Sequence, residues 1–441
     1  MGHSQEVETR YRWVILALAV LAVFGALGLS RFSYTSILPF MQDGLRLSNS
    51  QAGGLATANL AGYMTMAILG GALASRFGPR YVISGGLLLA SLGMVITGMA
   101  GSYSLALGGR FLSGIGAAGA SVPGHTMATM WFPVTRRALS AGTAATGCSV
   151  GLVVVGPLIP FLMERWGPEG WRRTWLVLAA AVAVIALIAL LGIRNRPHAR
   201  HQVPRPSERD RPAGWRRIYF SPRVWHLGVV YFLFGFAYMA YLTFFTKRLI
   251  ADVGYTAEKA GTLFMILGWA SLACGILWGW VADRIGRGRA MTLILLLQTL
   301  SYSLFALSQR QSALVASALL FGITAWGVPA IMAALCSDLV GPRMAPAAYG
   351  FLTVFHGLGQ ATGPYVAGKL ADALTTFTTS YLMAAGVALC GALGIAAYRR
   401  VGTRAEDVPR PEDLPGHECP PGATLAGQPA DQPSLDPSAS R

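Results

Sequence analysis

Four ionisable side chains interrupt the long apolar stretches of this sequence: Arg31, Arg110, His125 and His356. An ionised side chain at the centre of a membrane costs about 2.5–3.5 kcal/mol, so each of the four needs a physical reason. All four are positive or can become so, whereas Asp283, Asp338 and Asp372 stand only at the ends of such stretches. A cation would need a buried carboxylate to replace the water it loses. The four side chains therefore favour an anion, and Arg can meet a carboxylate through two parallel hydrogen bonds.

The elements that must position these side chains are membrane-spanning helices. Of 441 residues, 54% are hydrophobic and 12% are charged, against about 25% charged in soluble domains. An apolar segment of about 17–25 residues is long enough to cross a bilayer as a helix. Twelve such segments lie at residues 13–40, 51–74, 81–100, 104–130, 139–162, 174–193, 224–246, 258–281, 291–307, 313–337, 347–370 and 380–398. We therefore expect an all-α membrane protein with twelve transmembrane helices.

The net charge of +16 reflects membrane topology rather than nucleic-acid binding. With the N-terminus placed in the cytoplasm, most of the 35 Lys and Arg residues fall in the termini and the cytoplasmic loops. Basic residues accumulate on that side of membrane proteins. The sequence therefore predicts that both termini are cytoplasmic and that the partner is a lipid bilayer, with no nucleic acid. The five Cys residues are scattered without CxxC spacing, so we expect no metal site and no cofactor.

The chain repeats itself at an offset of 207–208 residues. The pairs that keep this offset are Gly71 and Gly279, Gly114 and Gly322, Gly142 and Gly350, Arg136 and Arg343, and Gly156 and Gly363. A fixed offset across several segments indicates duplication of a six-helix unit. We predict an N-terminal half at residues 1–193, a basic cytoplasmic linker at 194–223 and a C-terminal half at 224–400. The Pro-rich residues 401–441 have few large apolar side chains and are expected to form a disordered cytoplasmic tail.

A charged turn follows the second segment of each half. It reads GALASRFGPR at residues 71–80 and GWVADRIGRGR at residues 279–289. With the twelve segments and the basic central loop, it resembles the G-x-L-x-D-R-x-G-R signature of the major facilitator superfamily. The matching residues are Gly71, Leu73, Arg76, Gly78 and Arg80 in the first half, and Gly279, Asp283, Arg284, Gly286, Arg287 and Arg289 in the second.

Further motifs narrow this resemblance. Arg110, Gly114 and Gly116 match an R-x-x-x-G-x-G pattern of the superfamily. The stretches MWFPVTRRALSAGTAATG and GWRRTW are similar to the monocarboxylate and oxalate–formate carriers, whereas LSRFSYTSILPFMQ resembles an uncharacterised bacterial branch. The resemblance implies two pseudo-symmetric six-helix halves and a functional monomer in a bacterial inner membrane. It also implies a central cavity lined mainly by spans one, four, seven and ten.

The resemblance further implies that the two charged turns act as gates. Their positive side chains would meet helix C-terminal carbonyls and a neighbouring carboxylate in one conformation and lose these contacts in the other. The first turn has Ser75 where the family has Asp. We therefore expect the inner gate to depend on Asp283 and its neighbours, including Asp338. The alternative is that both turns carry only the charge that sets topology.

Arg31 is the leading candidate for contact with a substrate. It lies roughly 12 Å below the outer end of its segment, counting 1.5 Å per helical residue. The alternative is an Arg that extends to the outer surface. Arg110 is either a second substrate contact or a residue of structure and coupling. His125 shares a helical face with Arg110, and His356 has Gln360 one turn away; each His is either a proton or substrate ligand or a satisfied core residue.

An aromatic stripe marks the seventh segment. Its rings recur at steps of three and four residues and therefore share one helical face; they are Tyr231, Phe234, Tyr238, Tyr241 and Phe245. Facing a cavity, the hydroxyls would bond a carboxylate and the rings would pack on its apolar part. Facing lipid, the stripe would be ordinary. The weaker candidates for substrate contact are Tyr34, Asn59, Tyr63 and Trp326.

The eighth segment departs from the carboxylate carriers, which are expected to hold a basic residue there. It reads LFMILGWASLACGILWGWV and has no basic residue. Either Arg31 has taken over that role from the other half, or the substrate is different.

We expect a secondary active transporter that moves a small, monocarboxylate-like organic anion by alternating access. Moving one negative charge inward costs about 2.3 kcal/mol per 100 mV, so accumulation requires a proton or an exchanged anion. One alternative is efflux of amphipathic compounds, which suits the aromatic stripe but not the missing carboxylate. A remote alternative is a non-transporting membrane sensor. The sequence has no H-E-x-x-H, G-x-S-x-G or P-loop motif, so we expect no enzyme.

Overall fold

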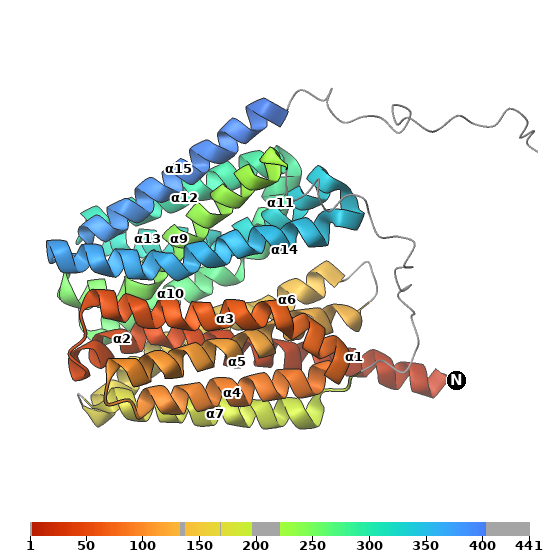
Figure 1. Ribbon diagram of the computed structural model, residues 1–441, viewed down its shortest axis with the longest axis horizontal. Helices are drawn as coiled ribbons and strands as arrows, with labels where there is room; N and C mark the ends of the chain where they lie inside the picture. Colours follow the sequence, from red (N-terminus) through yellow and green to blue (C-terminus); the bar gives the residue numbers. More distant parts are fainter. Residues whose placement is uncertain (1, 133–136, 168, 196–220, 403–441) are drawn as a thin grey trace, which may run out of the picture. The chain divides into compact units, whose positions relative to one another are not determined.

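The computed structural model describes residues 2–132, 137–167, 169–195 and 221–402, and the residues up to Arg399 form one compact unit. Most of the predicted linker and nearly all of the predicted tail lie outside the described residues. Every element in the described part is a helix (Figure 1). The first half contains α1 (Gly2–Val23), η1 (Phe24–Phe32), α2 (Ser33–Gly44), α3 (Asn49–Phe77), α4 (Pro79–Gly98), α5 (Tyr103–Met130), α6 (Arg137–Trp166) and α7 (Gly170–Gly192). The second half contains α9 (Pro222–Ala251), α10 (Ala257–Leu272), α11 (Cys274–Ile285), α12 (Arg287–Leu307), α13 (Gln311–Thr324), α14 (Gly327–Leu374) and α15 (Thr378–Gly402).

The prediction of an all-helical membrane protein is confirmed, whereas the count of twelve spans stays a prediction. Among the described residues, nine helices are long and apolar enough to cross a membrane, or ten if the bent pair α10 and α11 forms one span. Neither α3 nor the C-terminal part of α14 is among them. Both carry polar side chains such as Asn59 and Gln360, and the two helices pack against each other.

Three of the predicted segments are interrupted near their centres. The first contains η1, a π-helix that carries Arg31 in its last turn. The eighth bends by 50° between α10 and α11, and the tenth breaks between α13 and α14. Conversely, α14 runs through residues 338–346, where the sequence predicts a loop between segments ten and eleven. Departures from regular α-helix geometry often mark functional positions.

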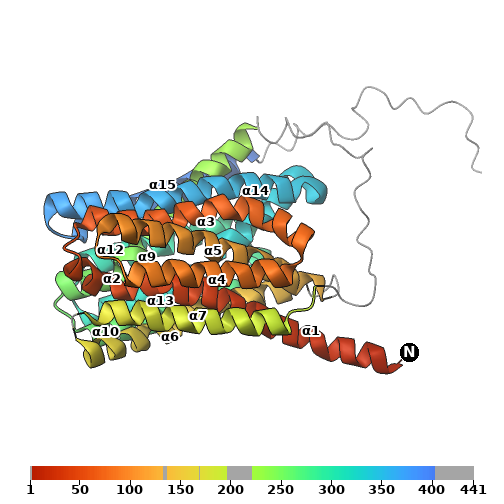
Figure 2. The same ribbon diagram turned by 60° about the horizontal axis from the view of Figure 1, so that its bottom comes forward.

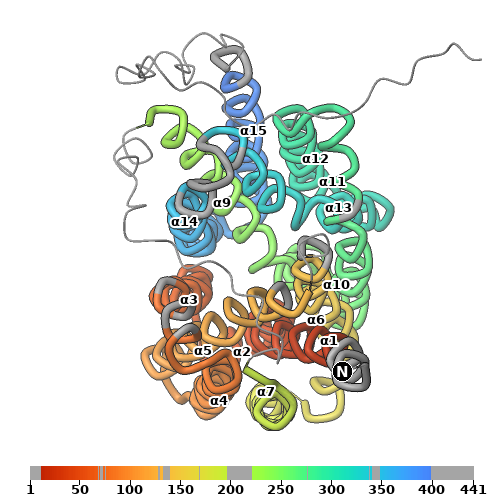
Figure 3. The backbone as a smooth tube through the Cα atoms, turned by 90° about the vertical axis from the view of Figure 1, so that its right-hand side faces the viewer, coloured from red at the N-terminus to blue at the C-terminus, as the bar shows by residue number. Residues whose placement is uncertain are grey.

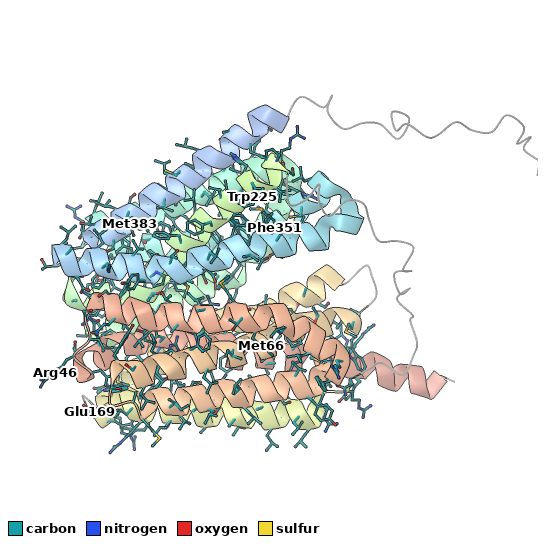
Figure 4. All side chains as sticks on the ribbon, in the orientation of Figure 1. Arg46, Met66, Glu169, Trp225, Phe351 and Met383 are labelled. Atoms are coloured by element: carbon teal, nitrogen blue, oxygen red, sulfur yellow. The ribbon has the colours of Figure 1, made fainter. Side chains whose placement is uncertain are left out.

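The helices of each predicted half pack mainly among themselves, and a few pairs join the two. The boundaries of the halves stay a prediction, because residues up to Arg399 form one unit. In the first half α4 packs against α5 and α7, and in the second half α9 packs against α14. The α9–α14 contact includes Trp225 and Phe351, whose rings meet edge to face at 5.8 Å (Figure 4). The pairs α3–α14, α6–α10 and α2–α9 join the halves. Figures 2 and 3 show α3 and α14 lying next to each other from two further directions.

Glycine allows the two halves to approach backbone to backbone. A Cβ atom added to Gly53 of α3 would collide with the carbonyl group of Pro364 in α14. Likewise, a Cβ atom added to Gly261 of α10 would collide with the carbonyl group of Gly156 in α6. Small residues at helix crossings bring membrane helices together in this way. The close contacts of α3 with α14 and of α6 with α10 therefore depend on these glycines.

The two charged turns have the same backbone conformation. Gly78 ends α3 with φ 87° and ψ 146°, and Gly286 ends α11 with φ 88° and ψ 144°. A residue with a side chain rarely adopts a positive φ, so glycine is required at both positions. The two glycines are 208 residues apart, which agrees with the offset of the sequence repeat.

Candidate functional site

Arg31 lies at the junction of the two halves. The π-helix turn of η1 directs its side chain towards the second half, and the residue is only 7% exposed. Its Nη2 donates a hydrogen bond to Gln360 Oε1 of α14 at 3.0 Å and lies 3.8 Å from Met239 Sδ of α9. One cation from the first half is therefore held by polar atoms of two helices from the second.

Gln360 continues this contact to His356, one turn earlier on α14. The Nε2 atoms of Gln360 and His356 are 2.9 Å apart. The imidazole ring stacks on the ring of Tyr231 at 4.3 Å and on that of Phe234 at 5.3 Å. The predicted residues Arg31, Gln360 and His356 thus form one hydrogen-bonded chain across the two halves.

Aromatic rings surround the Arg31 guanidinium. It lies 5.3 Å from the ring centroid of Tyr63 and 5.8 Å from that of Phe32. Phe32 contacts Trp326 at 6.0 Å, and Trp326 contacts Tyr238 at 5.9 Å. A cation over aromatic faces is stabilised electrostatically, and the same rings offer apolar contact to a ligand. Of the predicted residues, the structure therefore gathers Arg31, Tyr63, Tyr231, Tyr238, Trp326, His356 and Gln360, which we call the junction group.

Among the described residues, no carboxylate pairs with the charge of Arg31. The three ion pairs between described residues join Arg172 to Glu169, Lys247 to Asp43 and Arg287 to Asp338. The Nε atom of Arg31 is buried and has no hydrogen-bond partner in the described part of the chain, as is also true of the Nε atoms of Arg110 and Arg248. A buried guanidinium with an unused donor favours the approach of an anion. No group of three possible metal ligands occurs among the described residues.

Arg110 lies in a separate cluster inside the first half. It is 1% exposed, and its Nη1 donates to the carbonyl of Ser30 at 3.0 Å. Its guanidinium lies over the rings of Tyr34, at 4.6 Å, and Trp175, at 5.4 Å. Asn59 donates to the backbone oxygen of Arg110 at 3.0 Å. The predicted residues Arg110, Tyr34 and Asn59 are thus bound to one another and not to the junction group.

Two further predicted residues also lie apart from the junction group. The Nδ1 atom of His125 is 2.7 Å from the carbonyl oxygen of Ser121, one turn earlier on the same helix. The hydroxyl of Ser121 also bonds the hydroxyl of Tyr63 at 3.2 Å. Within the described residues, His125 is therefore linked to the junction residue Tyr63 only through Ser121. Tyr241 bonds Ser317 at 2.9 Å within the second half. The stripe of α9 is therefore divided, with Tyr231 and Tyr238 at the junction and Tyr241 inside its own half.

The charged turns place Arg80 on the end of α7 and Arg287 against the side of α14. Arg80 Nε donates to the carbonyl of Leu190 in the last turn of α7 at 2.5 Å. Arg287 Nη1 donates to the carbonyl of Ala334 and pairs with Asp338 Oδ1, each at 2.5 Å. Arg76 and Arg284 lie over the rings of their neighbours Phe77 and Trp280. The remaining predicted gate residues occupy the turns or their flanking helices: Gly71 in α3, Gly279 and Asp283 in α11, and Arg289 in α12. Their gating role stays a prediction.

Several contacts of the junction were not found from the sequence. Ser271 of α10 donates to Ser149 of α6 at 2.7 Å, and Trp326 Nε1 donates to the same oxygen at 3.2 Å. Nothing in the sequence around Ser149 and Ser271 indicates that these two side chains face each other. Met239 is different, because it lies 208 residues after Arg31. The repeat offset would have placed it opposite Arg31.

The chain resembles known transporters over most of its length. A family described as "Uncharacterised MFS-type transporter YbfB" matches residues 23–396. A hexuronate transporter of Bacillus subtilis is 24% identical, covering 89% of this chain and 97% of that protein. A probable sulfoacetate transporter of Cupriavidus necator is 26% identical over 64% of this chain and 67% of that protein. Monocarboxylate transporter 13 of Rattus norvegicus is 26% identical over 73% of this chain and 74% of that protein. A solved structure of a bacterial homologue of the human lysosomal transporter Spinster has a TM-score of 0.68 with 19% identity, covering 88% of this chain and 95% of that one. These matches confirm the resemblance to the major facilitator superfamily.

Proposed function

Because the chain belongs to the MFS-type transporter family whose model matches residues 23–396, we propose that it is a secondary transporter of a small organic anion. The proposal rests mainly on Arg31, whose buried guanidinium lies at the junction of the halves and has no carboxylate partner among the described residues. A carboxylate or sulfonate oxygen would accept from Arg31, and the rings of Tyr63, Tyr238 and Trp326 would contact the rest of the ligand. The named relatives support the proposal, since they are a probable sulfoacetate transporter, a hexuronate transporter and a monocarboxylate transporter.

Alternating access is the mechanism that fits this site. In this mechanism the two halves rock about a central ligand and open it to one side at a time. Arg31 belongs to the first half, and Gln360 and Met239 belong to the second. A ligand on Arg31 would therefore touch both halves and respond to their relative movement.

The site suggests what drives anion transport, and the charge distribution suggests how the chain is oriented in the membrane. His356 lies in the junction group and is the candidate proton carrier, with anion exchange as the other coupling. The basic residues of the predicted cytoplasmic loops support our proposal that both termini lie in the cytoplasm of a bacterial cell and the protein in its inner membrane. We assign it no catalytic role.

A thermal-shift experiment with the purified full chain tests the proposal. The probes are sulfoacetate, glucuronate, pyruvate and the lipophilic cation tetraphenylphosphonium. A ligand at 100 times its Kd stabilises the native state by about 2.7 kcal/mol, which is readily measured. We expect an anion to stabilise the parent protein and Arg46→Gln, which changes an exposed arginine, but not Arg31→Gln. Uptake of that anion into vesicles containing only this protein completes the test.

A second candidate function is efflux of amphipathic compounds. The rings of Phe32, Trp326 and Tyr238 form a continuous apolar contact at the junction, which such compounds would find favourable. Stabilisation by tetraphenylphosphonium alone, unchanged in Arg31→Gln, would select this candidate over anion transport.

A further inference from the structure

The side-chain amide of Gln360 lies between Arg31, which needs a hydrogen-bond acceptor, and His356. Its Oε1 accepts from Arg31 Nη2 at 3.0 Å, and its Nε2 is 2.9 Å from His356 Nε2. A guanidinium only donates hydrogen bonds, so the amide oxygen must face Arg31. The amide NH2 group must then face His356. This orientation follows from the donors and acceptors themselves, because the reverse orientation would point NH2 at Arg31.

The orientation of Gln360 determines the state of His356. Because the amide donates to His356 Nε2, that nitrogen must carry a lone pair, so the ring is neutral with its proton on Nδ1. The Nδ1 side of the ring lies against the backbone of α9 at Gly235. A Cβ atom added to Gly235 would lie 2.8 Å from His356 Nδ1, so only glycine leaves room for the ring here. The structure therefore shows the form of the chain Arg31–Gln360–His356 in which His356 is neutral, and its Nδ1 atom is buried without a hydrogen-bond partner among the described residues.

We propose that Gln360 is a relay that links protonation of His356 to anion binding at Arg31. The inference rests on the proposed function, because it assigns the coupling of that same site. A proton from solution binds His356 Nε2 and makes it a donor. The amide of Gln360 then turns over, so that Oε1 accepts from His356 and NH2 faces Arg31. No covalent bond other than the N–H bond forms or breaks, and deprotonation reverses the change.

The turned amide takes away the oxygen of Gln360 that accepts a hydrogen bond from Arg31. Arg31 Nη2 loses its acceptor, and its Nε already has none among the described residues. The two guanidinium donors and the amide NH2 would then be available to a carboxylate that enters between the halves. An anion supplies acceptors to all three, whereas without an anion they would remain unpaired at a cost.

The groups around His356 favour joint binding of a proton and an anion. Among the described residues, the titratable or charged side chains near it are Tyr231 of α9, stacked at 4.3 Å, and Arg31 of η1, which is linked to it through Gln360. Tyr349 of α14 follows beyond Tyr231, with the two hydroxyls 3.5 Å apart. None of these is an acid that would balance a second positive charge beside Arg31. An anion would balance it, and by linkage each ligand strengthens binding of the other.

The relay predicts that one proton moves with each monoanion. The pair carries no net charge, so its movement avoids the cost of about 2.3 kcal/mol per 100 mV that a lone anion would meet. Symport of this kind follows because the amide oxygen of Gln360 can face either Arg31 or a protonated His356, but not both at once.

Binding of sulfoacetate, glucuronate and pyruvate to the full chain between pH 5 and pH 8 tests the relay. In the parent protein we expect affinity to rise as pH falls, by up to about tenfold per pH unit, the limit for one coupled proton. Gln360→Ala removes the amide that competes for Arg31, so its affinity at pH 8 should rise towards that of the parent at pH 5. Gln360→Glu places a carboxylate on Arg31 and should abolish binding at pH 8. Gln311→Ala, which changes an exposed glutamine of α13, should behave like the parent.

The outcomes separate the relay from the proposed function. Weaker binding of Gln360→Ala at every pH would show a merely structural glutamine and overturn the relay. A parent affinity that does not change with pH would also overturn it, while leaving anion transport intact. If none of the three anions binds the parent at any pH, the proposed function fails.

A measurement of the His356 tautomer tests the relay without any ligand. In the ¹⁵N spectrum of histidine-labelled protein, the His356 signals are those lost in His356→Phe. We expect a neutral ring at pH 8 that is protonated on Nδ1 and bare on Nε2, and a ring protonated on both nitrogens at lower pH. A neutral ring protonated on Nε2, or one that stays neutral down to pH 5, would overturn the relay.

Discussion

Asp372 of α14 caps the first turn of α3 across the two halves. Its Oδ1 accepts from the backbone N–H of Asn49, and its Oδ2 accepts from that of Ser50, both at 2.7 Å. The helix already has its own cap, since Ser48 and Gln51 form a reciprocal capping box. Asp372 thus satisfies two N–H groups that this box leaves free. Because the carboxylate comes from the second half, the bond must break whenever the halves part at this end.

We predict that Asp372→Asn weakens this contact at neutral pH and has no effect in strong acid. Burial alone would raise the pKa of the Asp372 carboxyl, but the hydrogen bonds from Ser50 and Asn49 outweigh it and hold the pKa below its usual value. A lowered pKa means that the stabilisation is present above the ordinary Asp pKa of about 3.9 and is lost as pH falls through the lower value. The expected loss is about 0.3–1 kcal/mol, the range for exposed charges at helix ends. Thermal unfolding at pH 7 and at pH 2 measures it, with Glu164→Gln as an exposed control. An equal loss at both pH values would contradict this account.

We predict that Arg110→Met lowers stability far more than Arg31→Gln does. Arg110 is enclosed by Tyr34, Trp175 and Ser30, so its replacement leaves a carbonyl unpaired and a poorly filled space. Such changes typically cost about 2–4 kcal/mol. Arg31 instead lies where the two halves meet and, among the described residues, bonds only to side chains of the second half, so its loss should mainly remove ligand binding. The comparison uses the unfolding temperature and anion affinity of both variants. An Arg110→Met protein of parental stability that no longer binds the anion would instead make Arg110 a substrate contact.

We predict that Gly53→Val holds the halves apart where α3 meets α14. A side chain at this position would collide with the carbonyl group of Pro364, and backbone atoms cannot give way as a flexible side chain can. Gly85→Val is the matched control, because nothing lies within 4 Å of a Cβ atom added there. Cysteine placed at Ser50 should be alkylated faster in the Gly53→Val background than in the parent or the control. Equal rates in all three proteins would show that this contact does not keep the halves together.

We predict that the pair Arg287–Asp338 affects transport more than stability. Both side chains are partly exposed, 35% and 58%, and exposed ion pairs are worth about 0–1 kcal/mol. A gate contact, however, changes the balance between two conformations that differ by only a few kcal/mol. Arg287→Gln, Asp338→Asn and the double variant should therefore unfold within a few degrees of the parent but differ in transport rate. Additive effects of the two substitutions on transport would show that the pair does not act as a unit.

The sequence by itself determined the class of this protein and its repeat. Hydropathy and the scarcity of charge require a helical membrane protein, because only helices satisfy their backbone groups within a long apolar segment. The offset of 208 residues predicts that the turns at Gly78 and Gly286 are equivalent, and both glycines have a positive φ in the structure. The list of intramembrane charges also singled out Arg31 and the pair His356 and Gln360. These inferences depend on local composition and spacing, which a single chain displays directly.

Only the tertiary structure decided which of those residues meet. Arg31 and Arg110 look alike in sequence, yet Arg31 reaches Gln360, 329 residues away, and Arg110 reaches Ser30 inside its own half. The stripe of α9 was visible, but not its division between Tyr238 at the junction and Tyr241 in the interior. Helical periodicity says which side chains share a face, whereas the neighbour that covers the face depends on how the helices pack. The hydrogen bonds of Gln360 and Asp372 arise from that packing alone.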